Sequence, residues 1–283
     1  MTIRHFMHAL SALSLPRNEA RLLLAHVLKR DHAWLVAHDD YVPSENEIAQ
    51  INTLTTRRAA GEPIAYLLGE RDFYGRSFRC TPAALIPRPE TELLIDRALL
   101  LLPADSSSRV ADRAPLSVLD VGTGTGCIAI TIALERPTAL VTAIDISPEA
   151  LALARDNAQR LQASVIFIQS NWLAALPIDA RFDMILSNPP YIVPGDAHLS
   201  QGDLRFEPAV ALADAVDGLE SYRQLAFGAL RHLRPGSSLI VEHGFEQGES
   251  VPALFRAAGF ADIETLRDLA GLARVTCCHA PRP

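Results

Sequence analysis

The spacing of hydrophobic and polar positions changes along the chain. Residues 1–70 show the three- and four-residue spacing of amphipathic helices, and one apolar stripe consists of Leu22, Leu23, Leu24, Val27 and Leu28. Ser44 and Glu47 have the spacing of a capping box, which predicts a further helix with apolar positions over residues 48–54. We therefore expect a small helical bundle at the N-terminus.

The helical pattern is interrupted after this region. Residues 61–69 contain glycine and proline, and residues 73–78 predict a β-hairpin with Gly75 in its turn. We expect residues 71–90 to form a hairpin linker between two domains. A helix is predicted next, over residues 91–102.

From residue 116 onward, short apolar runs alternate with helical segments. A polar, serine-rich connector at residues 103–115 precedes this region. The predicted strands are residues 117–121, 140–144, 165–169, 182–186, 239–242 and 273–279. Such alternation predicts an α/β domain with a doubly wound, mostly parallel sheet, here spanning residues 91–283.

The composition is that of a globular protein. Of its 283 residues, 49% are hydrophobic and 21% are charged, and no apolar run approaches the ~20 residues of a membrane span. The N-terminus lacks the pattern of a signal peptide. The four cysteines form no C-x-x-C pair, so reduced thiols and a cytoplasmic location are expected. The scattered histidines predict no metal site.

The net charge of −7 is unevenly distributed. Residues 1–80 contain ten basic and nine acidic residues, whereas residues 81–283 contain 16 basic and 24 acidic residues. Binding to duplex DNA depends on cationic neutralisation of phosphates. The acidic C-terminal part therefore argues against direct binding of nucleic acid.

A glycine-rich loop follows the first predicted strand. It reads Gly122-Thr123-Gly124-Thr125-Gly126, and Asp145 ends the next strand, where a carboxylate can accept hydrogen bonds from ribose hydroxyls. The G-x-G-x-G spacing departs from the dinucleotide pattern G-x-G-x-x-G. Asp120, just before the loop, is suited to a cationic ammonium or sulfonium group. Together these features favour S-adenosylmethionine over NAD.

Asn171 and Trp172 follow the third predicted strand. There they would lie beside an adenine ring, with Asn171 bonding its edge and Trp172 flanking its face. Packing in the core is the alternative role for Trp172.

The tetrapeptide Asn188-Pro189-Pro190-Tyr191 lies just beyond the carboxyl end of the fourth predicted strand. Two prolines stiffen the turn and remove two backbone donors. An amide side chain, free carbonyls and an aromatic face suit a planar NH2 group, whose hydrogens the oxygens would accept and whose plane Tyr191 would cover. A stiff turn without chemical function is the alternative.

The glycine loop, the carboxylate and the tetrapeptide together resemble class I methyltransferases that act on planar nitrogen. Further segments narrow this resemblance to the peptide chain release factor N(5)-glutamine methyltransferase family. These segments are residues 61–66, residues 86–92, residues 205–208 and Asp217-Gly218-Leu219. The resemblance covers nearly the whole chain.

The resemblance implies a substrate, a methyl donor and site residues. The substrate would be the glutamine of the Gly-Gly-Gln motif in class 1 release factors, and the donor S-adenosylmethionine. Residues 122–126, Asp145, Trp172 and Asn188 would contact the donor. The substrate-binding residues would be Asn188, Pro189, Pro190 and Tyr191, with Asn188, Pro189 and Tyr191 as the catalytic set. The helical bundle would dock the protein substrate, and we expect a monomer with no membrane partner.

Two positions depart from the family pattern, and alternative functions remain open. Asn171 stands where relatives often carry Asp, and residues 213–215 replace a more glycine-rich turn.

The same tetrapeptide can bind a flipped adenine, so an adenine-amine methyltransferase of DNA or RNA is an alternative function. A glutamine methyltransferase of a ribosomal protein and a non-catalytic cofactor-binding module are others.

Overall fold

The computed structural model of the chain describes residues 1–12, 15–103, 115–214 and 216–283. These residues divide into two compact units, Met1–Glu70 and Arg71–Pro283. Most of the predicted connector at residues 103–115 lies outside the described residues.

The first unit is helical, as the pattern of apolar positions predicts. Its helices are α1 (Ile3–Ala12), α2 (Arg17–Leu28), α3 (His32–Ala37), α4 (Glu45–Ala59) and α5 (Ile64–Leu68). The capping box before α4 is confirmed, because Ser44 Oγ accepts from Glu47 N and the Glu47 carboxylate accepts from Ser44 N at 2.7 Å.

The apolar stripe of α2 is narrower than predicted. Leu23, Leu24, Val27 and Leu28 are buried, whereas Leu22 is 44% exposed. The four buried positions follow the helical period, and Leu22 lies outside their face. Leu24, Val27 and Leu28 pack with Ile3, Phe6, Leu35 and Ile51 in the core of this unit.

The second unit begins with the predicted hairpin. Its strands are β1 (Glu70–Phe73) and β2 (Arg76–Arg79), with the chain crossing the unit boundary inside β1. Tyr74 and Gly75 occupy the turn with φ of 49° and 70°, the left-handed pair typical of tight hairpin turns. A 3-10 turn at Pro89–Thr91 then leads into α6 (Glu92–Leu101).

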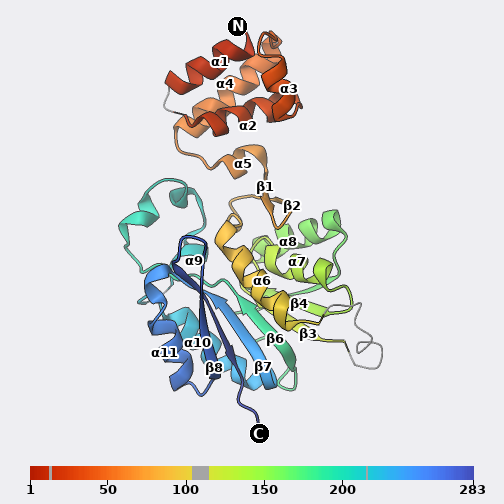
Figure 1. The fold of residues 1–283 in the computed structure, drawn as a ribbon, viewed down its shortest axis with the longest axis vertical. Coiled ribbons are helices and arrows are strands. Elements are labelled where there is room, and N and C mark those ends of the chain that lie inside the picture. The colour runs from red at the N-terminus through yellow and green to blue at the C-terminus, as the bar shows by residue number, and fades with distance from the viewer. Residues whose placement is uncertain (13–14, 104–114, 215) are drawn as a thin grey trace. The chain divides into compact units, whose positions relative to one another are not determined.

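A seven-stranded sheet with the order β5-β4-β3-β6-β7-β9-β8 forms the centre of this unit (Figure 1). The strands are β3 (Ser117–Val121), β4 (Leu140–Asp145), β5 (Val165–Gln169), β6 (Phe182–Ser187), β7 (Leu233–Glu242), β8 (Ala261–Arg267) and β9 (Ala273–His279). Only β9 runs antiparallel to its neighbours. The mostly parallel sheet is thus confirmed. The pattern missed β8, because this edge strand is largely exposed and lacks a buried apolar run.

Helices cover both faces of the sheet (Figure 1). One core joins the sheet to α6, α7 (Cys127–Glu135) and α8 (Pro148–Leu161). The other joins it to α10 (Glu220–His232) and α11 (Ser250–Ala257). The shorter elements are α9 (Ala209–Leu212) and 3-10 turns at Ala197–Ser200, Leu204–Phe206 and Phe245–Gln247.

The chain reverses its direction of travel across the sheet at β3. From there it proceeds to β4 and β5 on one side, and then returns to place β6 on the other. The carboxyl ends of β3 and β6 therefore lie at a topological switch point, where open α/β sheets bind ligands.

Candidate active site

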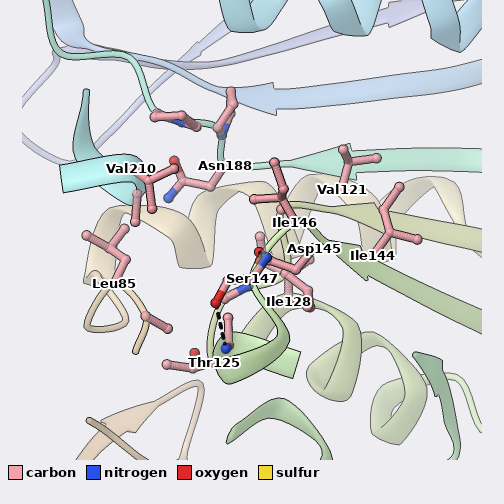
Figure 2. Close-up of a pocket in the computed structure, with 18 of the residues that line it drawn as sticks. Leu85, Val121, Thr125, Ile128, Ile144, Asp145, Ile146, Ser147, Asn188 and Val210 are labelled. Atoms are coloured by element: carbon pink, nitrogen blue, oxygen red, sulfur yellow. Dashed lines mark hydrogen bonds between the residues drawn. The ribbon is translucent and has the colours of Figure 1, made fainter. Parts of the chain in front are cut away.

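A cavity opens at the carboxyl ends of β3, β4, β5 and β6 (Figure 2). The loops after these strands contribute residues 121–125, 144–147, 170–172 and 188–190 to its lining. Figure 2 shows Leu85 and Val210 on one side of the cavity and Ile144 and Ile146 on the other. The site thus combines apolar walls with a few polar groups at the strand ends, the usual character of a small-molecule site.

The glycine loop lines the cavity, as predicted, through Gly122, Thr123, Gly124 and Thr125. Gly122 and Gly124 have φ of 73° and 56°, values that side-chain-bearing residues rarely adopt. The backbone can therefore lie close to a bound molecule.

Gly126, the last glycine of the loop, is not among the residues that line the cavity, and its predicted contact with the donor remains a prediction. A Cβ there would lie 2.8 Å from Ile130 Cδ1 and 3.1 Å from Ala154 Cβ. Its lack of a side chain permits the close packing of α7 and α8.

Asp145 ends β4 and lines the cavity, as predicted. Its Oδ2 accepts from Gly124 N at 2.9 Å, and its Oδ1 accepts from Ser147 N at 2.9 Å. These bonds hold the carboxylate rigidly. Each carboxylate oxygen can accept a second bond, so the group retains capacity for hydroxyl donors of a ligand. The predicted cap of α8 is also present, with Ser147 Oγ accepting from Ala150 N.

The position of Asp120 disagrees with the sequence prediction that it meets a cationic group of a ligand. Its side chain is fully buried and lies outside the cavity lining. Its Oδ2 accepts from the Thr123 hydroxyl at 2.6 Å and from Ala129 N at 3.2 Å, which fastens the glycine loop to the start of α7. Burial raises the pKa of Asp120 to about 7.

Asn171 and Trp172 both line the cavity. Trp172 also packs against the core beside α10 and α11, which is the alternative role considered for it. Its contact with an adenine ring remains a prediction. Its φ of 50° is unusual for a bulky residue, and Ser170 Oγ donates to its carbonyl at 2.5 Å. This conformation is held by the turn that follows β5.

The tetrapeptide follows β6 and presents Asn188, Pro189 and Pro190 to the cavity. Ser187 Oγ donates to Val121 O at 2.8 Å, which ties this turn to the end of β3. The Pro190 carbonyl accepts from Ser221 Oγ at 2.7 Å. Within the described parts of the chain, no group donates to the Pro189 carbonyl or to Asn188 Oδ1.

Tyr191 is half-buried and lies outside the lining of this cavity. Its backbone is held by neighbouring loops: Gln247 Nε2 donates to its carbonyl at 3.3 Å, and a Cβ on Gly218 would lie 2.9 Å from that oxygen. Burial raises its pKa to about 12, so its phenol stays neutral near pH 7. Its predicted contact with a substrate amide remains a prediction.

The turn before α10, where the sequence departs from the family pattern, is held by Asp214. Its Oδ1 accepts from Gly218 N at 2.8 Å and its Oδ2 accepts from Glu220 N at 2.6 Å. The loop between Asp214 and α10 is therefore anchored by one carboxylate. Residue 215 lies outside the described residues.

Two pairs at the site were not predicted. Arg88, which lines the cavity, forms an ion pair with the buried Glu207. Glu207 also accepts from Ile86 N at 2.9 Å, so it joins two segments far apart in the sequence. Thr91 Oγ1 donates to Glu242 Oε2 at 2.6 Å. The sequence did contain a signal that could have identified Glu242, because it is an acidic residue at the end of the apolar strand β7.

Comparisons with known proteins agree with this geometry. Residues 100–216 match the methyltransferase small domain family, and residues 2–69 match the PrmC N-terminal domain family. A release factor glutamine methyltransferase of Bordetella pertussis is 51% identical over 93% of this chain and 94% of its own length. The chain belongs to the release factor glutamine methyltransferase family. The Escherichia coli member of this family is 42% identical, covering 97% of this chain and 96% of its own.

Solved structures support the fold assignment of this family member. A methyltransferase from Pyrococcus furiosus matches with a TM-score of 0.51 and 19% identity, covering 81% of this chain and 99% of its own. The hMettl16 catalytic domain matches with a TM-score of 0.55 and 14% identity, covering 81% and 84%. At these identities the matches show the fold alone, which is that of class I methyltransferases.

Within the described residues, no helix has both the length and the apolar character needed to cross a membrane. The same part of the chain brings together no group of three His, Cys, Asp or Glu side chains placed to hold a metal ion. No disulfide joins the four cysteines, all of which lie within the described residues.

Proposed function

We propose that this chain transfers a methyl group from S-adenosylmethionine to the side-chain amide nitrogen of a release factor glutamine, the glutamine of the Gly-Gly-Gln motif in class 1 factors. The observation that carries this proposal is the pair of free acceptors at the tetrapeptide, Asn188 Oδ1 and the Pro189 carbonyl. An amide NH2 has two donors and no strong charge, so two oriented acceptors match it.

The cavity fits the proposed methyl donor. The Asp145 carboxylate can accept from ribose hydroxyls, and Trp172 and Ile146 offer apolar contacts for an adenine ring. The glycines of the loop allow close approach of the ligand to the backbone. When bound, S-adenosylmethionine supplies an electrophilic methyl group on a sulfonium sulfur.

The chain's own residues act by positioning. The nitrogen of an amide is a weak nucleophile because its lone pair is delocalised into the carbonyl. Accepting both amide hydrogens at Asn188 and Pro189 would orient the nitrogen and favour positive charge developing on it. The bond from methyl carbon to sulfur breaks as the bond to nitrogen forms, and one amide proton then passes to solvent.

Substrate assays with labelled S-adenosylmethionine test this proposal. We expect label in the Gly-Gly-Gln glutamine of a release factor, and none in a factor with that glutamine replaced by alanine. Parallel reactions contain ribosomal protein, DNA and RNA. Label found only in one of these other substrates would contradict the proposal.

We also propose that the first unit docks the release factor, because one glutamine offers little area for selecting a protein. A groove in this unit is lined mainly by apolar and basic side chains, including Met7, Arg17, Arg21 and Val36, together with the acidic Asp39. A Val36→Asp variant should raise KM for intact release factor by roughly tenfold and leave a short Gly-Gly-Gln peptide unaffected. Ile178→Asp, at a 90% exposed position of the second unit, is the matched control. Equal KM values for Val36→Asp and the control would contradict the docking role.

The proposed reaction belongs to translation termination, so we expect it to take place in the cytoplasm.

A further inference from the structure

A short chain of hydrogen bonds, the relay, runs from Glu242 at the end of β7 through Thr91 to Asn188 in the tetrapeptide. Glu242, the last residue of β7, is 2% exposed and accepts from the Thr91 hydroxyl at 2.6 Å. Thr91, also 2% exposed, accepts from Asn188 Nδ2 at 3.1 Å. Residues from three separate elements therefore meet behind the asparagine side chain.

The donors and acceptors in this chain determine how the Asn188 amide is oriented. An ionised carboxylate can only accept, so the single hydroxyl hydrogen of Thr91 must point toward Glu242. The Thr91 oxygen is then an acceptor for Asn188, and only the NH2 end of the amide can donate to it. Asn188 Oδ1 is consequently left for another donor.

We propose that Thr91 and Glu242 are positioning residues, which hold the Asn188 side chain with its carbonyl oxygen directed at the substrate amide. This inference rests on the proposed function, since it explains how the acceptor of that reaction is oriented. Without the relay, either end of the amide can face the substrate. The NH2 end would repel the hydrogens of a glutamine amide instead of accepting them.

Protonation of Glu242 should weaken this control. The pKa of Glu242 is raised to about 7, chiefly by burial and also by Glu90, whereas the Thr91 hydrogen bond, the charge of Arg274 and the nearby Asn188 side chain act to lower it. The titratable or charged groups facing Glu242 are Glu90, Cys127, Tyr191, Tyr222 and Arg274. A protonated carboxyl can donate to Thr91, which can then donate to a rotated Asn188. The catalytically oriented amide is thus favoured above pH 7.

Steady-state kinetics of the full chain with release factor test the relay. Thr91→Val, which removes the hydroxyl but keeps the shape, should lower kcat by roughly 10- to 100-fold and leave the Kd for S-adenosylmethionine within about twofold. Thr91→Ser should restore most of the activity. Thr131→Val is the matched control, because Thr131 is buried and its hydroxyl has no partner among the described residues. A Thr91→Val enzyme as active as this control would overturn the proposal.

The pH profile gives a second test. The wild-type kcat should rise by up to about tenfold from pH 6 to pH 8, and Glu242→Gln should lower kcat at pH 8 and flatten that rise. If Glu242→Gln retains the wild-type profile, the proposal is wrong. Thermal melts of each variant show whether it is folded, and Thr91→Val remains informative if Glu242→Gln fails to fold.

A readout without substrate separates this inference from the proposed function. The side-chain amide resonance of Asn188 should shift with an apparent pKa near 7 in the wild type and stay constant in Thr91→Val. A constant resonance in the wild type would contradict the relay even if release factor is methylated. Conversely, absence of release factor methylation would remove the proposed function but leave the titration to be observed.

Discussion

The glycine loop after β3 and the tetrapeptide after β6 lie at adjacent strand ends but use their polar groups differently. At the loop, carboxylates accept some of the donors: Asp145 accepts from Gly124 N, and Asp120 accepts from the Thr123 hydroxyl and from Ala129 N in α7. In the tetrapeptide, no group among the described residues donates to Asn188 Oδ1 or to the Pro189 carbonyl. In the proposed reaction, the loop would serve as a rigid binding wall, whereas the tetrapeptide would hold oriented acceptors for the reacting group. Binding and chemistry should therefore be separable by mutation.

The largest expected effect is on chemistry. Asn188→Ala removes the free acceptor and should lower kcat by roughly 100- to 1000-fold, the range measured for loss of one transition-state hydrogen bond. The Kd for S-adenosylmethionine, measured by calorimetry, should change much less. A variant with near-wild-type turnover would show that the tetrapeptide is only a stiff turn.

The next effect should appear in binding. Asp145→Ala removes the acceptor for a ligand hydroxyl and the bond that holds Gly124 N, so the Kd for S-adenosylmethionine should rise roughly 100-fold. At saturating donor, kcat should stay within about threefold of the wild type. A large fall in kcat with an unchanged Kd would reverse the roles assigned to the two regions.

A smaller effect concerns the stability of the loop. Gly126→Ala forces a Cβ against Ile130 and Ala154 at a φ of +83°, and should lower the free energy of unfolding by roughly 2–4 kcal/mol. Gly259→Ala is the control, because its φ of +99° is also unfavourable but nothing lies within 4 Å. It should cost about 1 kcal/mol in urea unfolding. Equal losses would show that the packing of Gly126 is unimportant.

The smallest effect is a pH dependence of stability. The pKa of Asp120 is raised from 3.8 to about 7, so the unfolded chain loses this proton at lower pH than the folded chain. Unfolding is therefore increasingly favoured as pH rises between these values. Asp120→Asn lacks this titration, and its Tm relative to the wild type should increase by roughly 5 °C from pH 5 to pH 8. A pH-independent difference in Tm would contradict the raised pKa.

The elements that the sequence predicted correctly are those with strong local patterns. The capping box at Ser44, the turn at Gly75 and the strands on either side of the glycine loop depend on residues close together in the chain. The edge strand β8 was missed because exposed edge strands need no apolar alternation. Leu22 was misplaced because a run of adjacent leucines does not specify which members face the core.

The amino-acid sequence by itself determined the fold class, the family resemblance and the short motifs of the site, because each depends on local periodicity or on contiguous residues. Only the tertiary structure decided which groups remain available for a ligand. Asp120 is fully buried outside the cavity, and its Oδ2 accepts from the loop it precedes. Thr91 meets Glu242 across 151 positions, and Arg88 meets Glu207 across 119. Contacts at such separations arise from the order of strands in the sheet and the packing of helices on it, which no local pattern records.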